Sequence, residues 1–137
     1  MMRRIVAALL GPLLLLGAAV GCASSGEVKV LKNTTVALEV GKSRTLINAS
    51  VGDLVKLELP PVELVGYGWQ VFMQDSRFLV QKSAIIPPAA PGGRPTISFL
   101  AVHRTPARTT VRFLLVKLDG AKETNPVDGH DAVFTVD

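Results

Sequence analysis

Val55-Lys56-Leu57-Glu58-Leu59 alternates apolar and charged side chains one by one. Because successive side chains of a β-strand point to opposite faces of the sheet, this stretch buries one face and exposes the other. Similar short runs recur between turn-forming residues, and no long segment shows a helical period. They span residues 35–40, 68–73, 78–81, 96–103, 109–117 and 132–136. About seven strands at this spacing predict an all-β fold, an antiparallel β-sandwich.

Two connections between the expected strands are longer than hairpins require. Residues 87–95 contain four prolines, which donate no backbone hydrogen bond, and therefore form a loop. Residues 117–131 are polar and rich in turn-forming pairs, and we expect a second loop there. Long loops on a rigid sandwich frequently carry function, so both are candidate binding segments.

The amino terminus has the three zones of an export signal. Arg3 and Arg4 precede an apolar run over residues 5–16, and small residues follow as far as Cys22, the only cysteine. The apolar run is too short for a permanent membrane span. Ala19-Val20-Gly21-Cys22 resembles the lipobox of bacterial lipoproteins, which implies cleavage before Cys22 and acylation of that residue, with palmitate among the expected chains. The alternative is a secretory peptide cut nearby, which leaves a free thiol.

This reading divides the chain into a signal peptide (1–21), a lipidated tether (22–32) and one sandwich domain (33–137). We expect a protein of the cell envelope, anchored to a membrane through lipid on Cys22, because several acyl chains give stable anchoring. Ala23 stands where an aspartate commonly retains lipoproteins at the inner membrane. If the bacterium has an outer membrane, the sequence therefore favours that location.

The charge balance does not indicate nucleic acid as a partner. The chain has 15 basic and 11 acidic residues, for a net charge of +4, which falls to +2 once Arg3 and Arg4 leave with the signal peptide. The distribution is uneven, since seven basic residues and no acid lie between Asp75 and Asp119, and most acids of the carboxyl-terminal part follow. Either the two segments neutralise each other in a sheet, or a basic face meets an anionic membrane or partner.

No motif for catalysis or metal binding is present in the sequence. There is no G-x-S-x-G elbow, and Gly41-Lys42-Ser43 lacks the first glycine of a phosphate-binding loop. His103 and His130 lack metal-ligand spacing, so we expect structural or solvated roles for both. The acids between Asp119 and Asp131 do not follow the EF-hand pattern, although a calcium site there is a minor alternative. We therefore expect no enzyme activity, cofactor or metal.

Residues 51–60, V-G-D-L-V-K-L-E-L-P, and residues 66–69, G-Y-G-W, resemble chagasin-type inhibitors of papain-like cysteine peptidases. In that family a V-G-[DE] turn and an alternating strand ending in L-P lead into an N-P-T-T-G loop, then an aromatic residue and a tryptophan. The resemblance implies an immunoglobulin-like sandwich that presents three loops at one end, and a cysteine peptidase as partner. It also places Trp69 in the core, with Val71 on the same face.

The resemblance places three peptidase-binding loops on this chain, but their residues depart from the family pattern. Val65 stands where the family has a threonine that contacts the catalytic site, and no tryptophan follows the third loop's basic residue. The candidate binding residues are Val62, Glu63, Leu64, Val65, Gly66, Pro91, Gly92, Gly93, Lys117, Leu118 and Asp119. The apolar first loop either enters an apolar pocket on a partner or folds back to cap the sandwich.

The sequence therefore supports two functions. One is a lipid-anchored inhibitor whose three loops block the cleft of a papain-like peptidase. The other is a non-inhibitory binding or assembly lipoprotein that uses the same sandwich.

Overall fold

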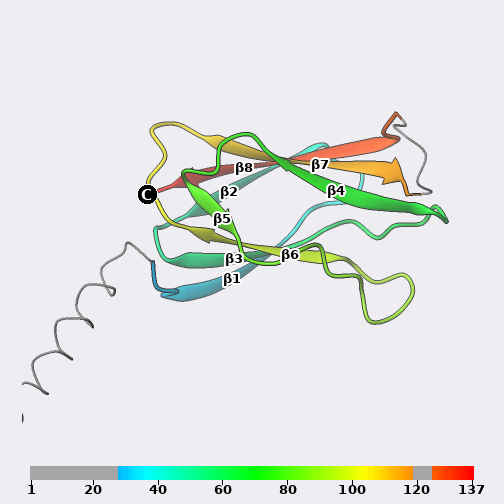
Figure 1. Cartoon of the computed structure of the whole chain (residues 1–137), viewed down its shortest axis with the longest axis horizontal. Helices are drawn as coiled ribbons and strands as arrows, with labels where there is room; N and C mark the ends of the chain where they lie inside the picture. Colours follow the sequence, from blue (N-terminus) through cyan, green and yellow to red (C-terminus); the bar gives the residue numbers. More distant parts are fainter. Residues whose placement is uncertain (1–27, 119–124) are drawn as a thin grey trace, which may run out of the picture.

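The computed structural model describes residues 28–118 and 125–137, which form two packed four-stranded sheets without a helix in these ranges. The first sheet has the order β1-β3-β6-β5 and the second β2-β8-β7-β4, and Figure 1 shows them as two layers. The strands are β1 (Lys32–Ala37), β2 (Arg44–Ala49), β3 (Asp53–Glu58), β4 (Tyr67–Met73), β5 (Leu79–Gln81), β6 (Thr96–Ala101), β7 (Thr109–Lys117) and β8 (Asp128–Val136). The expected all-β, immunoglobulin-like sandwich is confirmed.

The strand pairing is not purely antiparallel, which corrects the sequence-based expectation. β1 pairs with β3 and β2 pairs with β8 in parallel, whereas the other ladders are antiparallel. The cause is the path of the first three strands, which reverse direction at each turn and also change sheet each time. β1 and β3 therefore reach the same sheet running the same way.

β2 raises the described strand number to eight and is the strand that the sequence did not reveal. Its inward residues Ile47 and Ala49 are buried, but Leu46 points outward and is exposed. An apolar residue on the solvent face removes the alternation that marks a half-buried strand. β8 also begins four residues earlier than expected, at Asp128, so the second long loop is shorter than predicted.

The core lies between the two sheets and is built from the inward residues of both. Phe99 of β6 and Phe134 of β8 meet edge to face across it, with ring centroids 6.2 Å apart. The predicted burial of Trp69 is confirmed, since only 8% of it is exposed, and Val71 packs against the same cluster. The buried core side chains all lie between Leu38 and Val136, so this part of the chain has what it needs to fold independently.

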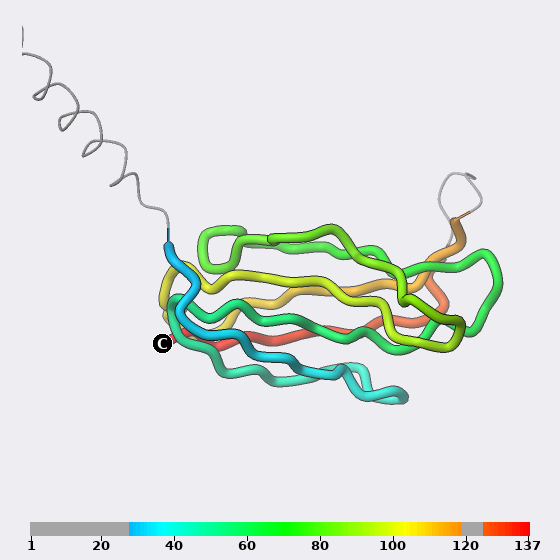
Figure 2. The backbone as a smooth tube through the Cα atoms, turned by 90° about the horizontal axis from the view of Figure 1, so that it is seen from below, coloured from blue at the N-terminus to red at the C-terminus, as the bar shows by residue number. Residues whose placement is uncertain are grey.

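The two ends of the sandwich are occupied by different parts of the chain. In Figures 1 and 2 the carboxyl terminus and the first described residues lie at one end, and the connections that follow β3 and β5, together with the end of β7, lie at the other. We call the latter the loop end. Cys22 and Asp119 lie outside the described residues. No helix within residues 28–118 and 125–137 is long and apolar enough to cross a membrane.

Candidate functional site

The strand registers bring the described parts of the three predicted binding loops to the loop end. Glu58, the last residue of β3, pairs with Thr96, the first residue of β6, so the loops after β3 and before β6 emerge together. In the second sheet, Tyr67 at the start of β4 pairs with Lys117 at the end of β7. The first and third loops therefore adjoin as well (Figure 1).

The first loop ends in a tight turn that pushes Val65 outward. The Tyr67 amide donates to the Leu64 carbonyl at 3.2 Å, and Gly66 has a φ of 85°. A positive φ at the third residue of a four-residue turn is typical of type II geometry, which favours glycine at that position. Val65 occupies the second position of the turn and is 98% exposed, so it forms the tip of the loop.

Trp69 fixes the other side of the first loop to the core. Its indole Nε1 donates a buried hydrogen bond of 2.9 Å to the Pro60 carbonyl. Pro60 is therefore held against β4 immediately before the loop leaves the sandwich. Since the proline ring and the indole hydrogen bond both restrict the backbone, the loop starts from a rigid base.

The second loop contains the same kind of turn. The Gly93 amide donates to the Ala90 carbonyl at 3.1 Å, Pro91 lies at the second position, and Gly92 has a φ of 83°. Proline followed by glycine is the preferred sequence for a type II turn. Arg94 anchors the base of this loop, because its Nη1 donates to the Leu38 carbonyl at 2.9 Å and to the Glu58 carbonyl at 3.2 Å.

The third loop is described only at its two sides. Lys117 closes β7, and the Leu118 amide donates to the Gly66 carbonyl at 2.7 Å, which joins this loop to the first. The Leu118 side chain covers Gly68, where a Cβ would lie only 2.5 Å from Leu118 Cδ1. Gly68 therefore allows the start of the third loop to pack onto β4.

The loop end carries a cluster of exposed apolar side chains, which bears on the two alternatives for the first loop. Val62 folds back and packs against the core, so capping is its role. Leu64, Val65 and Leu118 remain 49%, 98% and 56% exposed. The cluster is thus free to contact a partner, in the way that exposed apolar patches commonly mark interaction sites.

A cavity of about 310 Å³ adjoins the first loop and shows two apolar positions that sequence reasoning missed. Val40, in the β1–β2 turn, and Val127, just before β8, line it together with Leu64 and Trp69. Both valines are exposed. The Val40 turn reaches the loop end only because of where β2 lies, so no pattern in the sequence indicates it.

His130 lies beside this cavity and has a structural role, although it belongs to β8 and not to a loop as predicted. It is 2% exposed, and its Nε2 lies 2.7 Å from Thr45 Oγ1. Nδ1 is buried and has no hydrogen-bond partner among the described residues. Burial lowers the pKa of His130, and the nearby Lys42 backbone opposes this shift. His103 is exposed next to β6.

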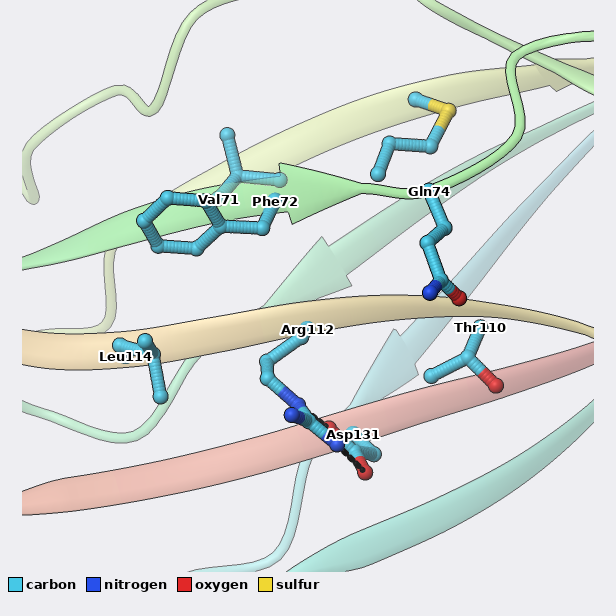
Figure 3. A pocket seen from close by; sticks show the side chains of 8 residues that line it. Val71, Phe72, Gln74, Thr110, Arg112, Leu114 and Asp131 are labelled. Atoms are coloured by element: carbon cyan, nitrogen blue, oxygen red, sulfur yellow. Dashed lines mark hydrogen bonds and ion pairs between the residues drawn. The ribbon is translucent and has the colours of Figure 1, made fainter.

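A second hollow, of about 720 Å³, lies over β4, β7 and β8 (Figure 3). Arg112 and Asp131 lie side by side in its lining and form an ion pair, with Nε and Oδ1 2.8 Å apart. The hydrogen bond to Arg112 lowers the pKa of Asp131, and the same contact raises the pKa of Arg112. This ion pair joins the basic segment between Asp75 and Asp119 to the acidic segment that follows it in the sequence.

No group of three metal-ligating side chains occurs within the described residues.

The fold has counterparts among solved structures. A cysteine protease inhibitor, EhICP2, from Entamoeba histolytica superposes with a TM-score of 0.58 at 16% sequence identity, over 77% of this chain and 97% of that one. The solution structure of amebosin superposes with a TM-score of 0.53 at 15% identity, over 75% of this chain and 98% of that one. No family model and no curated protein matches the sequence. The likeness confirms the fold implied by the resemblance to chagasin-type inhibitors.

Proposed function

We propose that this chain is a lipid-anchored inhibitor of papain-like cysteine peptidases, which blocks the active-site cleft with three loops. The observation that supports the proposal is that the described parts of the three predicted loops lie at one end of the sandwich, with Val65 98% exposed at the tip of the first. Further support comes from the fold, which a cysteine protease inhibitor shares.

The proposed mechanism is a competitive plug that supplies no catalytic group. Two type II turns present Val65 and Pro91 outward, and Gly66 and Gly92 keep the backbone at each turn free of side chains. Because Trp69 and Arg94 hold the loop bases by hydrogen bonds, little conformational entropy is lost when the loops enter a cleft.

The test is a titration of a papain-like peptidase of known active concentration with residues 28–137. We expect competitive inhibition by micromolar domain or less, and a domain that stays intact. Val65→Asp should weaken inhibition at least about a hundredfold, because a buried unpaired charge costs several kcal/mol. Val80→Asp on β5, an equally drastic change away from the loop end, is the matched control and should inhibit like the unmodified domain.

The anchor is tested separately with the full chain. We expect Cys22 to be acylated, so that the protein fractionates with membranes and Cys22→Ser leaves that fraction or remains unprocessed. A soluble protein with a free thiol would contradict the anchor without affecting the inhibition assay.

A specific observation favours the second candidate, a non-inhibitory binding lipoprotein. Leu64 and Val65 are exposed apolar residues where the resemblance to chagasin-type inhibitors implies threonines, and Leu118 adds a third exposed apolar side chain to the loop end. The absence of inhibition across several papain-like peptidases at micromolar domain would decide for this alternative.

A further inference from the structure

The end of the sandwich opposite the loop end gathers four segments that are far apart in the sequence. The Leu31 amide donates to the Gly52 carbonyl, and the Gly52 amide donates to the Ala101 carbonyl at 2.9 Å. The Thr105 amide donates to the Val136 carbonyl at 3.0 Å. The first described residues, the β2–β3 turn, the β6–β7 connection and the end of β8 therefore meet there (Figures 1 and 2).

Four exposed basic side chains lie on these segments, and we call this surface the basic end. They are Lys29, Lys32, Arg104 and Arg108. Within residues 28–118 and 125–137, none of their side chains makes an ion pair or a hydrogen bond to another side chain. Their charges are therefore available to a partner.

Acids at the basic end offset only part of this charge. Asp75 is paired with Arg77, with 2.6 Å between Oδ2 and Nη2. Asp53 is only 7% exposed, and its carboxylate accepts a hydrogen bond from the Ser50 amide. Asp137 is the exposed acid that remains. The four basic side chains thus leave this surface positive.

The loop end carries charges of both signs among its described residues. Lys42 is paired with Glu39 at 3.4 Å, and the guanidinium of Arg94 is occupied by backbone carbonyls. Glu63 and Asp128 are exposed there. Arg44, the first residue of β2, and Lys117, the last of β7, are exposed basic residues at the same end, so the loop end has mixed charge, whereas the unpaired side chains of the basic end are mainly positive.

We propose that the basic end binds the anionic headgroups of a phospholipid membrane and directs the loop end away from it. The partner is a membrane because the chain enters the sandwich at this end, and this choice rests on the lipid anchor proposed for Cys22. Cys22 lies six positions before residue 28, and six extended residues span at most about 20 Å. A basic residue close to an anionic membrane improves binding by roughly fivefold, and this attraction falls off within about 8 Å at physiological salt.

This inference goes beyond inhibition and requires neither a peptidase nor the acyl chain for its test. Residues 28–137 are sedimented with vesicles of phosphatidylcholine containing about 30% phosphatidylglycerol, or with pure phosphatidylcholine, at about 0.05 M and 0.5 M NaCl. We expect binding to the anionic vesicles at low salt, no binding to the neutral ones, and release at high salt.

The decisive comparison uses two double variants of equal charge. R104A/R108A should weaken the partition into anionic vesicles about thirtyfold. K42A/K82A also removes two positive charges, but away from the basic end, and should bind like the unmodified domain. Trp69 fluorescence verifies that each variant is folded. The proposal would be overturned if both double variants lost affinity for anionic vesicles equally, or if the unmodified domain bound neutral vesicles as well as anionic ones. It would also be overturned if the domain bound no vesicles and captured an acidic protein instead.

Discussion

Replacing Trp69 tests the link between the core and the first loop. The side chain is 8% exposed and its Nε1 donates to the Pro60 carbonyl at 2.9 Å. Trp69→Ala removes the ring and leaves that carbonyl unpaired, so we expect the free energy of unfolding to fall by about 3–5 kcal/mol. Domains of this size have about 5–15 kcal/mol in total, so the variant should be close to unfolding.

A second variant separates packing from the hydrogen bond. Trp69→Phe keeps an aromatic ring but removes the indole donor, and we expect a loss of about 1–2 kcal/mol. The free energies of unfolding of both variants are measured by urea denaturation followed by far-ultraviolet circular dichroism. Tryptophan fluorescence cannot be used, because Trp69 is the only tryptophan and is lost in each variant. Leu46→Ala, an exposed position on β2, serves as control and should change stability by less than about 0.5 kcal/mol. If Trp69→Ala cost no more than this control, the described packing would be incorrect.

Three further changes have defined outcomes. Gly92→Ala should cost about 1–2 kcal/mol in thermal denaturation, since φ is 83° and nothing lies within 4 Å of a new Cβ; an unchanged melting temperature would argue against the turn. Arg94→Ala should cost about 2 kcal/mol because two backbone carbonyls lose a charged donor, whereas exposed Arg108→Ala should cost almost nothing. Burial lowers the pKa of His130, so the unfolded state binds the proton more readily, and stability should decline as the pH falls below the ordinary value of 6.5. His130→Gln should reduce that slope in urea titrations, and His103→Gln should leave it unchanged.

The fold could be predicted where one face of a strand is apolar and the other is polar. β3 shows this alternation, since Val55 and Leu57 are buried and Lys56 is exposed. β2 was missed because Leu46 lies on its solvent face. The parallel pairs escaped prediction for a different reason: alternation fixes which face is buried, but not which sheet a strand joins or which neighbour it meets.

The candidate site was predicted through the resemblance to chagasin-type inhibitors, and the prolines of residues 87–95 independently indicated one of its loops. Pro91-Gly92 and Gly66 occupy the positions that type II turns favour, which agrees with loops at both places. The exposed valines at positions 40 and 127 could not be predicted, because single apolar residues in turns have no periodicity and their approach to Leu64 depends on tertiary structure. The role of His130 was hidden for the same reason, since its partner Thr45 is 85 positions away.

The most direct test of the central claim asks whether the loop end and a cleft-filling inhibitor exclude each other. Binding of residues 28–137 to a papain-like peptidase is measured by calorimetry, first with the free enzyme and then with enzyme whose active-site cysteine carries a covalent peptide inhibitor. We expect binding to the free enzyme and a loss of at least about a hundredfold in affinity once the cleft is filled. Equal affinity for both forms would show that the domain binds elsewhere and would contradict the proposed plug.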